Sequence, residues 1–234
     1  MGEHLLPGNP PIAVDVRHSA RARRLSLRIS RRDGRVTLTL PRGMAVREGM
    51  AFAVEREEWL RRNLAEIRAT LVEEVPLAFG GTVPFRGEAV MLVPGAVRGP
   101  VLREGELVLP PDAARIGARV QGFLKAQARD ALAEAVDRHA ARLGRAYGRI
   151  TLRDTKGRWG SCSVRGDLMF SWRLVMAPPS VLDYVAAHEV AHLAEMNHSQ
   201  AFWAVVARLY PGYAAERAWL RAHGPGLHAV RFTG

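Results

Sequence analysis

The sequence predicts an α+β protein, with a β-rich N-terminal domain and a mainly helical C-terminal domain that holds a small sheet. Two observations predict this class. Residues 1–112 alternate apolar and polar side chains over short stretches separated by Gly and Pro, which is typical of strands and turns. Residues 113–234 contain long stretches in which apolar residues recur at helical spacing. We therefore place a domain boundary near residue 112.

The N-terminal domain begins with a predicted hairpin. Residues 25–29 and 36–40 each alternate apolar and polar side chains, and Asp33-Gly34 between them is a turn signal. Residues 46–75 then carry helical periodicity and predict the one helix of this domain. Three further strands are expected, at residues 82–85, 89–93 and 107–109.

The C-terminal domain begins with a long predicted helix over residues 113–143, which ends near Gly144. Two strands are expected at residues 150–153 and 168–175. The last two predicted helices cover residues 180–196 and 200–222, and the second should bend or break near Pro211-Gly212.

The composition favours a folded, soluble protein. The chain has 234 residues, of which 48% are hydrophobic, and this is enough to bury a core. It contains no run of 18 apolar residues that would predict a membrane span. The first residues lack the basic and apolar regions of a cleaved secretory signal. Cys162 is the only cysteine, so no intramolecular disulfide can form. We expect a cytoplasmic protein.

The charge is strongly basic and is carried almost entirely by arginine. The formal net charge is +11, and seven arginines cluster in residues 17–32. Such a charge attracts nucleic acid or acidic partners by long-range electrostatics. The same arginines could instead form the solvated face of a sheet, because they alternate with aliphatic residues. The sequence leaves both interpretations open.

Residues 188–192, His-Glu-Val-Ala-His, form an H-E-x-x-H motif. Residues four apart lie on the same face of a helix, so the imidazoles of His188 and His192 can converge on one ion. Glu189 projects about 100° away from His188, given 3.6 residues per turn, and can reach a metal-bound water without binding the metal. The motif therefore predicts a catalytic zinc site with Glu189 as the general base.

The surroundings of the motif support this prediction. The helix is apolar on nearly all sides, which is typical of a buried helix. Ser180 and Asp183, just after Pro178-Pro179, have the spacing of a capping box. Burying two histidines and a glutamate costs free energy unless they have strong interaction partners, and a metal ion would be such a partner. In the alternative interpretation, the histidines bond to backbone carbonyls and Glu189 forms a salt bridge.

A catalytic zinc site usually has a third protein ligand and leaves its fourth position for water. His198 is the leading candidate, because Asn197 can end the helix in a left-handed conformation and let the chain turn back. The rival is Glu216 on the last helix, since a downstream carboxylate completes other zinc sites. The spacing favours His198.

Residues 158–163, Arg-Trp-Gly-Ser-Cys-Ser, are too polar and too small to be ordinary core. We expect Trp159, Gly160 and Ser161 to bind substrate, as a strand edge that pairs with an extended peptide. In the alternative interpretation, Trp159 is a core aromatic residue and Gly160 marks a tight bend. Cys162 is not expected to act as a nucleophile.

Two further residues are candidate oxyanion partners, namely Tyr184, for which core packing is favoured, and Arg173. The remaining histidines lack ligand spacing and are expected at the surface: His4, His18, His139, His223 and His228.

Several motifs together resemble the YgjP-like metallopeptidase family, a relative of the SprT-like and WLM peptidases. The resemblance rests on residues 158–163, 172–174, 183–185, 188–193, 197–199 and 202–203, and the first strands extend it over most of the chain. It implies a zincin-like catalytic domain over residues 113–234, with His188, His192 and His198 as zinc ligands and Glu189 as the base. Val190, where this family is expected to have Leu, is the one departure within the motif.

The expected function is therefore zinc-dependent hydrolysis of peptide bonds in peptide or protein substrates. The alternative is a nucleic-acid-associated protein that binds through its basic N-terminal sheet, including a protease that acts on DNA-bound proteins. In that case the metal could be purely structural. Structural zinc sites are usually closed by four ligands and are often rich in cysteine. The single cysteine lies outside the motif, so a peptidase is favoured. Ni, Co or Cu would fit the same ligands.

Overall fold

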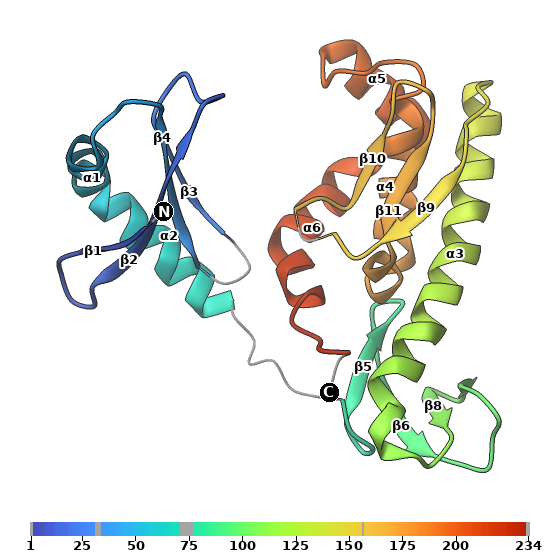
Figure 1. Cartoon of the computed structure of the whole chain (residues 1–234). Helices are drawn as coiled ribbons and strands as arrows, with labels where there is room; N and C mark the ends of the chain where they lie inside the picture. Colours follow the sequence, from blue (N-terminus) through green and yellow to red (C-terminus); the bar gives the residue numbers. More distant parts are fainter. Residues whose placement is uncertain (1, 31–33, 71–76, 156, 233–234) are drawn as a thin grey trace. The chain divides into compact units, whose positions relative to one another are not determined.

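The computed structural model describes residues 2–30, 34–70, 77–155 and 157–232, and it divides the chain into two compact units, Met1–Val72 and Glu73–Gly234 (Figure 1). Both units combine helices with small sheets, so the predicted α+β class is confirmed. None of the helices in these ranges is long and apolar enough to cross a membrane. The division falls earlier than the expected boundary near residue 112.

The first unit contains one four-stranded sheet and two helices. Its strands are β1 (Gly2–Leu6), β2 (Ile12–Ser19), β3 (Ser26–Ile29) and β4 (Val36–Pro41), in the order β1-β2-β4-β3. Strands β2 and β4 are parallel, and the other pairs are antiparallel. The helices are α1 (Val46–Glu55) and α2 (Glu57–Thr70). Alternate residues of the strands and one face of each helix form a core of their own.

The predicted hairpin is confirmed as β3 paired with β4, although Asp33 of its turn lies outside the described residues. The single helix predicted over residues 46–75 is two helices. They separate at Arg56, whose backbone leaves the helical region at φ −104° and ψ 13°. Residues 71–75 of that prediction also lie outside the described ranges. The sequence patterns did not predict β1, whose side chains are exposed except for Leu6.

The second unit begins with another four-stranded sheet, in the order β5-β6-β8-β7. Its strands are β5 (Thr82–Phe85), β6 (Glu88–Pro94), β7 (Val101–Arg103) and β8 (Glu106–Leu109). Buried residues of this sheet pack in the same core as α3 (Ile116–Leu143) and the helix of the H-E-x-x-H motif. This shared core is why the sheet belongs to the second unit and not to a domain that ends at residue 112.

The long helix α3 runs along the second unit, past both of its sheets (Figure 1). A short 3-10 turn, η1 (Ala113–Arg115), precedes it, and Gly144 ends it in the left-handed conformation at φ 70°, as predicted. Leu124, Ala128 and Leu132 lie on its fully buried face. The β5–β8 sheet lies by its N-terminal end, and the second sheet of this unit lies beside its C-terminal half (Figure 1).

That second sheet has three strands, in the order β10-β11-β9. They are β9 (Ile150–Arg153), β10 (Gly160–Cys162) and β11 (Leu168–Ser171). Strand β11 is antiparallel to β10 and parallel to β9. The strand predicted over residues 168–175 is therefore shorter, because the chain turns into the 3-10 helix η2 (Trp172–Met176). Strand β10 lies at the edge of this sheet.

Three helices complete the unit: α4 (Pro179–Ala191), α5 (Gln200–Leu209) and α6 (Tyr213–Leu227). The predicted break at Pro211-Gly212 is confirmed, since it separates α5 from α6. The predicted capping box on α4 does not form. Pro178 is the N-cap residue, and no side chain caps the helix. Asp183 instead accepts hydrogen bonds from α3, through Arg138 at 3.0 Å and His139 at 2.8 Å.

Candidate metal centre

Helix α4 places His188 and His192 one turn apart, with their ring centroids 5.2 Å from each other. The helix is buried on all sides, as its sequence predicts, and Val181, Ala187 and Val190 are fully buried. It therefore carries both imidazoles into the core of the second unit, where other elements can hold them in place.

The chain reverses direction after α4 and returns His198 to the pair. Residues 193–195 form tight turns on the end of the helix, and the side chain of Asn197 accepts a hydrogen bond from the Ser199 N–H at 3.1 Å. Ser199 in turn caps α5 by accepting from the Phe202 N–H at 3.3 Å. The prediction that Asn197 takes a left-handed conformation is wrong, since its φ is not positive. Its side chain makes the turn instead.

Three histidines meet at this point. One ligand nitrogen from each of His188, His192 and His198 lies within 4.8 Å of the others, and Nε2 of His188 is 3.1 Å from Nε2 of His198. Glu216, the rival third ligand, is not part of this group among the described residues. It contributes, after burial, to raising the pKa of Tyr210, with which it shares a hydrogen bond.

The protonation states suit metal binding. Nδ1 of His192 lies 3.0 Å from the carbonyl oxygen of Glu195, which can only accept, so Nδ1 carries the proton and Nε2 keeps its lone pair. Burial, together with the neighbouring His192, His198 and Arg217, lowers the pKa of His188 to about 3. His188 therefore stays neutral at physiological pH, which is the state that coordinates a metal.

The spacing of the nitrogens fits a small divalent ion. With Zn–N bonds of about 2.0–2.1 Å and a tetrahedral angle, two ligand nitrogens should lie about 3.3–3.4 Å apart. The observed 3.1 Å between the Nε2 atoms of His188 and His198 is close to this value. Nitrogen-only donor sets of this kind suit zinc and its neighbours in the first transition row better than magnesium or calcium.

Phe202, on α5, packs against all three imidazoles. Its ring centroid lies 4.9 Å from that of His188, 4.4 Å from His192 and 4.7 Å from His198, and its side chain has no exposed surface. Trp203 adds a second ring beside His188 and His198. These contacts hold the rings in one orientation before any ligand arrives. The position of Phe202 within a sequence motif did not predict this contact with the three imidazoles.

Glu189 is buried beside strand β10, with 5% of its side chain exposed. A Cβ added to Gly160 would lie 2.5 Å from Oε1 of Glu189 and 2.6 Å from its Cγ, so any other residue here would force the Glu189 side chain to move. Burial raises the pKa of Glu189 to about 8, although the charge of Arg158 opposes the shift. Burial, followed by the charges of Glu189 and Asp167, also raises the pKa of Cys162 to about 11, so this thiol is not ionised near neutral pH.

Strand β10 lies next to Glu189, and within the described part of the chain no strand pairs with its outer edge. The Trp159 carbonyl accepts a hydrogen bond from the Ser171 N–H at 2.8 Å, on the side of β11. Hydrogen-bonded and non-hydrogen-bonded pairs alternate in an antiparallel ladder, so the N–H and C=O of the next residue, Gly160, point away from β11. Cys162, two residues further along, has the same orientation. The three expected substrate-binding residues, Trp159, Gly160 and Ser161, thus lie along or beside this edge.

Trp159 is half-buried and is held by the C-terminal part of the chain. Its ring stacks on His228 at 4.9 Å, and a Cβ on Gly224 of α6 would lie 2.9 Å from it. The sequence did not predict that Gly224 and His228 contact Trp159. These contacts join residues more than 60 positions apart, and local sequence patterns do not predict such contacts.

The hydrogen bonds of Arg173 go to Asp154 and to two backbone carbonyl groups, so they do not support its expected role as an oxyanion partner. Arg173 is 7% exposed and makes two hydrogen bonds to the Asp154 carboxylate, at 2.7 and 3.1 Å. It also donates to the carbonyl oxygens of Leu227 and Val230, at 2.8 and 3.1 Å. A guanidinium with these partners is part of the core. Tyr184 is 5% exposed and packs its ring edge against His188 at 6.0 Å, in line with the favoured packing role.

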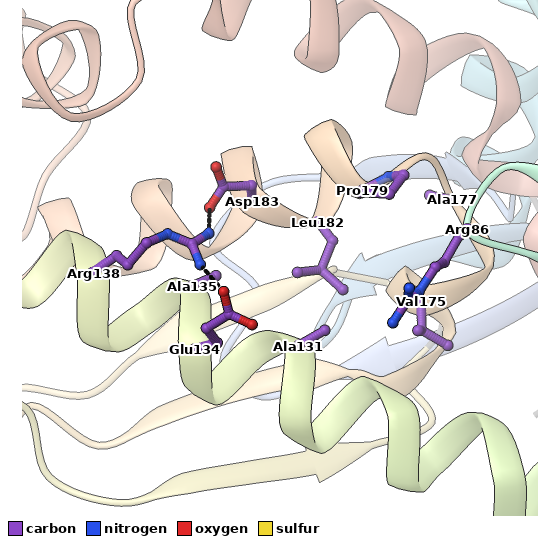
Figure 2. Close-up of a pocket in the computed structure, with 10 residues that line it drawn as sticks. All are labelled: Arg86, Ala131, Glu134, Ala135, Arg138, Val175, Ala177, Pro179, Leu182 and Asp183. Atoms are coloured by element: carbon purple, nitrogen blue, oxygen red, sulfur yellow. Dashed lines mark hydrogen bonds and ion pairs between the residues drawn. The ribbon is translucent and has the colours of Figure 1, made fainter.

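His139 is 3% exposed, so its predicted surface position is wrong. It belongs to an ion-pair network in which Arg138 bridges Glu134 at 2.6 Å and Asp183 at 3.0 Å. This network forms one wall of a pocket of about 250 Å³ between α3, α4 and the β5–β6 turn (Figure 2). Arg86 lies at the other end of the pocket. None of the three clustered histidines lines it.

A family model described as the YgjP-like metallopeptidase domain matches residues 23–223, a range that includes the histidine cluster. A search of curated proteins finds no match. Among solved structures, the crystal structure of the metallopeptidase zymogen of Pyrococcus abyssi abylysin is 22% identical over 40% of this chain and 92% of that chain, with a TM-score of 0.36.

Proposed function

The chain belongs to the YgjP-like metallopeptidase family, and from this premise we propose that it is a zinc-dependent peptidase. In this proposal His188, His192 and His198 hold the ion, and Glu189 is the general base. The observation that carries it is the convergence of three imidazole nitrogens within 4.8 Å, with a buried carboxyl group on the same helix. Three protein ligands leave a fourth position for water or substrate, as a catalytic site requires.

Zinc at this position would act as a Lewis acid, polarising the scissile carbonyl group and lowering the pKa of the attacking water. Glu189 would take a proton from that water and return it to the leaving amine. Burial suits this role, because a carboxylate with a raised pKa binds a proton more strongly than a solvated one. His192 is held ready by its bond to the Glu195 carbonyl, and Phe202 keeps the three rings in place.

The free edge of β10 supports a binding mode for an extended peptide. The outward N–H and C=O of Gly160 and Cys162 can pair with the backbone of a substrate, which would add a strand to the β10-β11-β9 sheet. Such pairing depends little on side chains, and so it suits peptide and protein substrates of varied sequence. Trp159, Gly160 and Ser161 are the substrate-binding residues in this proposal, and Gly160 also keeps the substrate edge close to Glu189.

The direct test compares the parent protein with Glu189→Gln, after both are loaded with zinc. We expect the parent to cleave casein or a quenched fluorescent peptide library, and the variant to lose at least about 100-fold in kcat/KM, because general base catalysis typically contributes 10²–10⁴-fold. Zinc content, measured by mass spectrometry of the metal, should be unchanged, since Glu189 is not a ligand in this proposal.

Glu195→Gln is the matched control. It makes the same chemical change near the site, and the backbone carbonyl that orients His192 is retained. Its turnover should stay within about threefold of the parent, because its side chain has no assigned role. Equal cleavage by the parent and Glu189→Gln would reject Glu189 as the base, and no cleavage by the zinc-loaded parent on any peptide would reject the peptidase.

A further inference from the structure

The sheet of the first unit has one covered face and one open face within that unit. Alternate residues of β2 and β4, such as Val14 and Leu38, are buried together with Leu60 and Leu64 of α2. Side chains of a strand alternate between its faces, so the intervening residues lie on the opposite face, away from α1 and α2. This open face carries Asp15, Arg17, Ser26, Arg28, Thr37 and Thr39.

The register aligns these residues in rows across three strands. Arg17 on β2 is opposite Thr39 on β4, which is opposite Ser26 on β3. The Arg17 Nε donates to the Thr39 hydroxyl at 3.1 Å, so its guanidinium is held over the sheet. In the neighbouring row Arg28 is opposite Thr37, and both arginines are exposed. The open face is therefore lined by guanidinium and hydroxyl groups.

The loop between β2 and β3 extends this basic surface. It carries Arg21, Arg23 and Arg24, all exposed, and it joins the end of β2 near Arg17 to the start of β3 at Ser26. Residues 16–32 contain no carboxylate. The acidic residues of the open face, Glu3 and Asp15, lie opposite each other on β1 and β2, and Asp15 is paired with Arg35 at 3.6 Å.

The charge of the first unit is divided unequally between its strands and its helices. Residues 1–42 contain nine arginines and three acidic residues, whereas residues 43–72 contain five of each. The net positive charge of this unit thus comes from residues 1–42, the part of the sequence that contains its four strands. A one-sided basic surface is the electrostatic footprint of a nucleic-acid-binding protein, whereas a general excess of arginine would be spread over both sides.

We propose that this open face binds the phosphate backbone of double-stranded nucleic acid, without reading its sequence. Guanidinium and hydroxyl groups are the usual donors to phosphate oxygens. The face carries no aromatic side chain on which unpaired bases could stack, which favours a duplex over a single strand. Its only bulky apolar side chain among the described strand residues is Leu5 of β1, which is 63% exposed, and one such residue is too little for a membrane interface. The surface belongs to the first unit, so this binding is independent of the proposed peptidase chemistry.

The test is fluorescence anisotropy with a labelled 20-base-pair DNA of arbitrary sequence and the full-length protein. If four of the exposed arginines each neutralise one phosphate, the slope of log K against log salt is about −3.6. Raising the salt from 50 to 200 mM should then weaken binding by about 100-fold. Arg24→Gln with Arg28→Gln should reduce the slope by about 2 and weaken binding at 50 mM salt by about tenfold or more.

Arg47→Gln with Arg62→Gln is the matched control, since it removes the same charge from exposed positions on α1 and α2. This control should change the affinity by less than about threefold, if the open face is the binding surface. Equal losses in the two double variants would overturn the proposal, because binding would then follow net charge alone. Tighter binding of a single-stranded 20-mer, or of vesicles with 30% phosphatidylserine, would overturn it in favour of a different partner. Binding by Glu189→Gln should equal that of the parent, whatever the outcome for peptide cleavage.

Discussion

Gly160 and Glu189 approach so closely that a Cβ on the glycine would lie 2.5 Å from the carboxylate oxygen Oε1. The contact joins edge strand β10 to helix α4, and it places the buried carboxyl group beside the free backbone edge. The residue type at position 160 therefore controls the position of the Glu189 side chain, although it has no side chain of its own.

Gly160→Ala should lower kcat by about 100-fold while leaving zinc content unchanged. The atoms that must move are at the end of the Glu189 side chain, and a displacement of about 1 Å in a catalytic group can cost that much. Steady-state kinetics with a fluorescent peptide, together with metal analysis, would check this. Gly122→Ala on α3, where a Cβ meets open space, is the control and should keep full activity. Full activity in Gly160→Ala would show that the contact has no catalytic consequence.

His198→Ala should weaken zinc binding by more than about 100-fold, because it removes one of the three proposed ligands, and loss of outer-sphere partners alone costs 10–100-fold. Competition with a chromogenic chelator would measure the affinity. Glu216→Ala, the change at the rival position, should leave the affinity within about twofold of the parent. If Glu216→Ala weakened zinc binding more than His198→Ala did, the third ligand would be Glu216 on α6 and not His198.

The stability of the metal-free protein should fall as the pH rises from about 4.5 to about 8, through the contribution of Glu189. Its pKa is about 8 in the folded protein and about 4.5 when unperturbed, so within this window the folded state keeps a proton that the unfolded state has lost. The contribution is fully present below pH 4.5 and is lost as the pH approaches 8. Its slope is at most about 1.4 kcal/mol per pH unit.

The measurement is urea unfolding in the presence of a chelator, for the parent and for Glu189→Gln. His188, whose pKa is lowered, destabilises both proteins alike as the pH falls below about 6.5, so the difference between the curves isolates Glu189. Parallel curves between pH 4.5 and 8 would contradict a buried, protonated Glu189.

Asp183→Ala should destabilise the second unit by about 1–3 kcal/mol, because it leaves the buried Nε2 of His139 without its partner. The pKa of Asp183 is lowered, since its bonds to His139 and Arg138 outweigh the effect of burial, so the carboxylate is ionised near neutral pH. Chemical unfolding would measure the loss. Asp130→Ala, on an exposed position of α3, should change the stability by less than about 0.5 kcal/mol. Equal effects of the two changes would show that the network contributes nothing.

The elements that could be predicted are those whose signals are local. The hairpin of β3 and β4, the end of α3 at Gly144 and the break at Pro211 follow from periodicity and from the backbone preferences of Gly and Pro. The grouping of His188, His192 and His198 followed from the spacing of one helix and the turn after it.

The predictions that failed concern contacts between distant parts of the chain. His139 and Asp183 are 44 residues apart, and their hydrogen bond explains both a buried histidine and the missing capping box. Arg173 is buried because residues 54 and 57 positions later supply carbonyl oxygens. The boundary differs from residue 112 because the β5–β8 strands share a core with α3. Strand β7, of three residues, is too short for a periodic signal.

The hydrogen bonds of Arg173 also determine which part of the second unit can complete its packing last during synthesis. A ribosome adds Leu227 and Val230 after Arg173, Trp159 and the histidines of α4. Until then the guanidinium lacks two of its acceptors, and Trp159 lacks the ring of His228 on which it stacks. A nascent chain that already contains all three histidines therefore lacks the contacts that hold Trp159, next to strand β10, in its final packing.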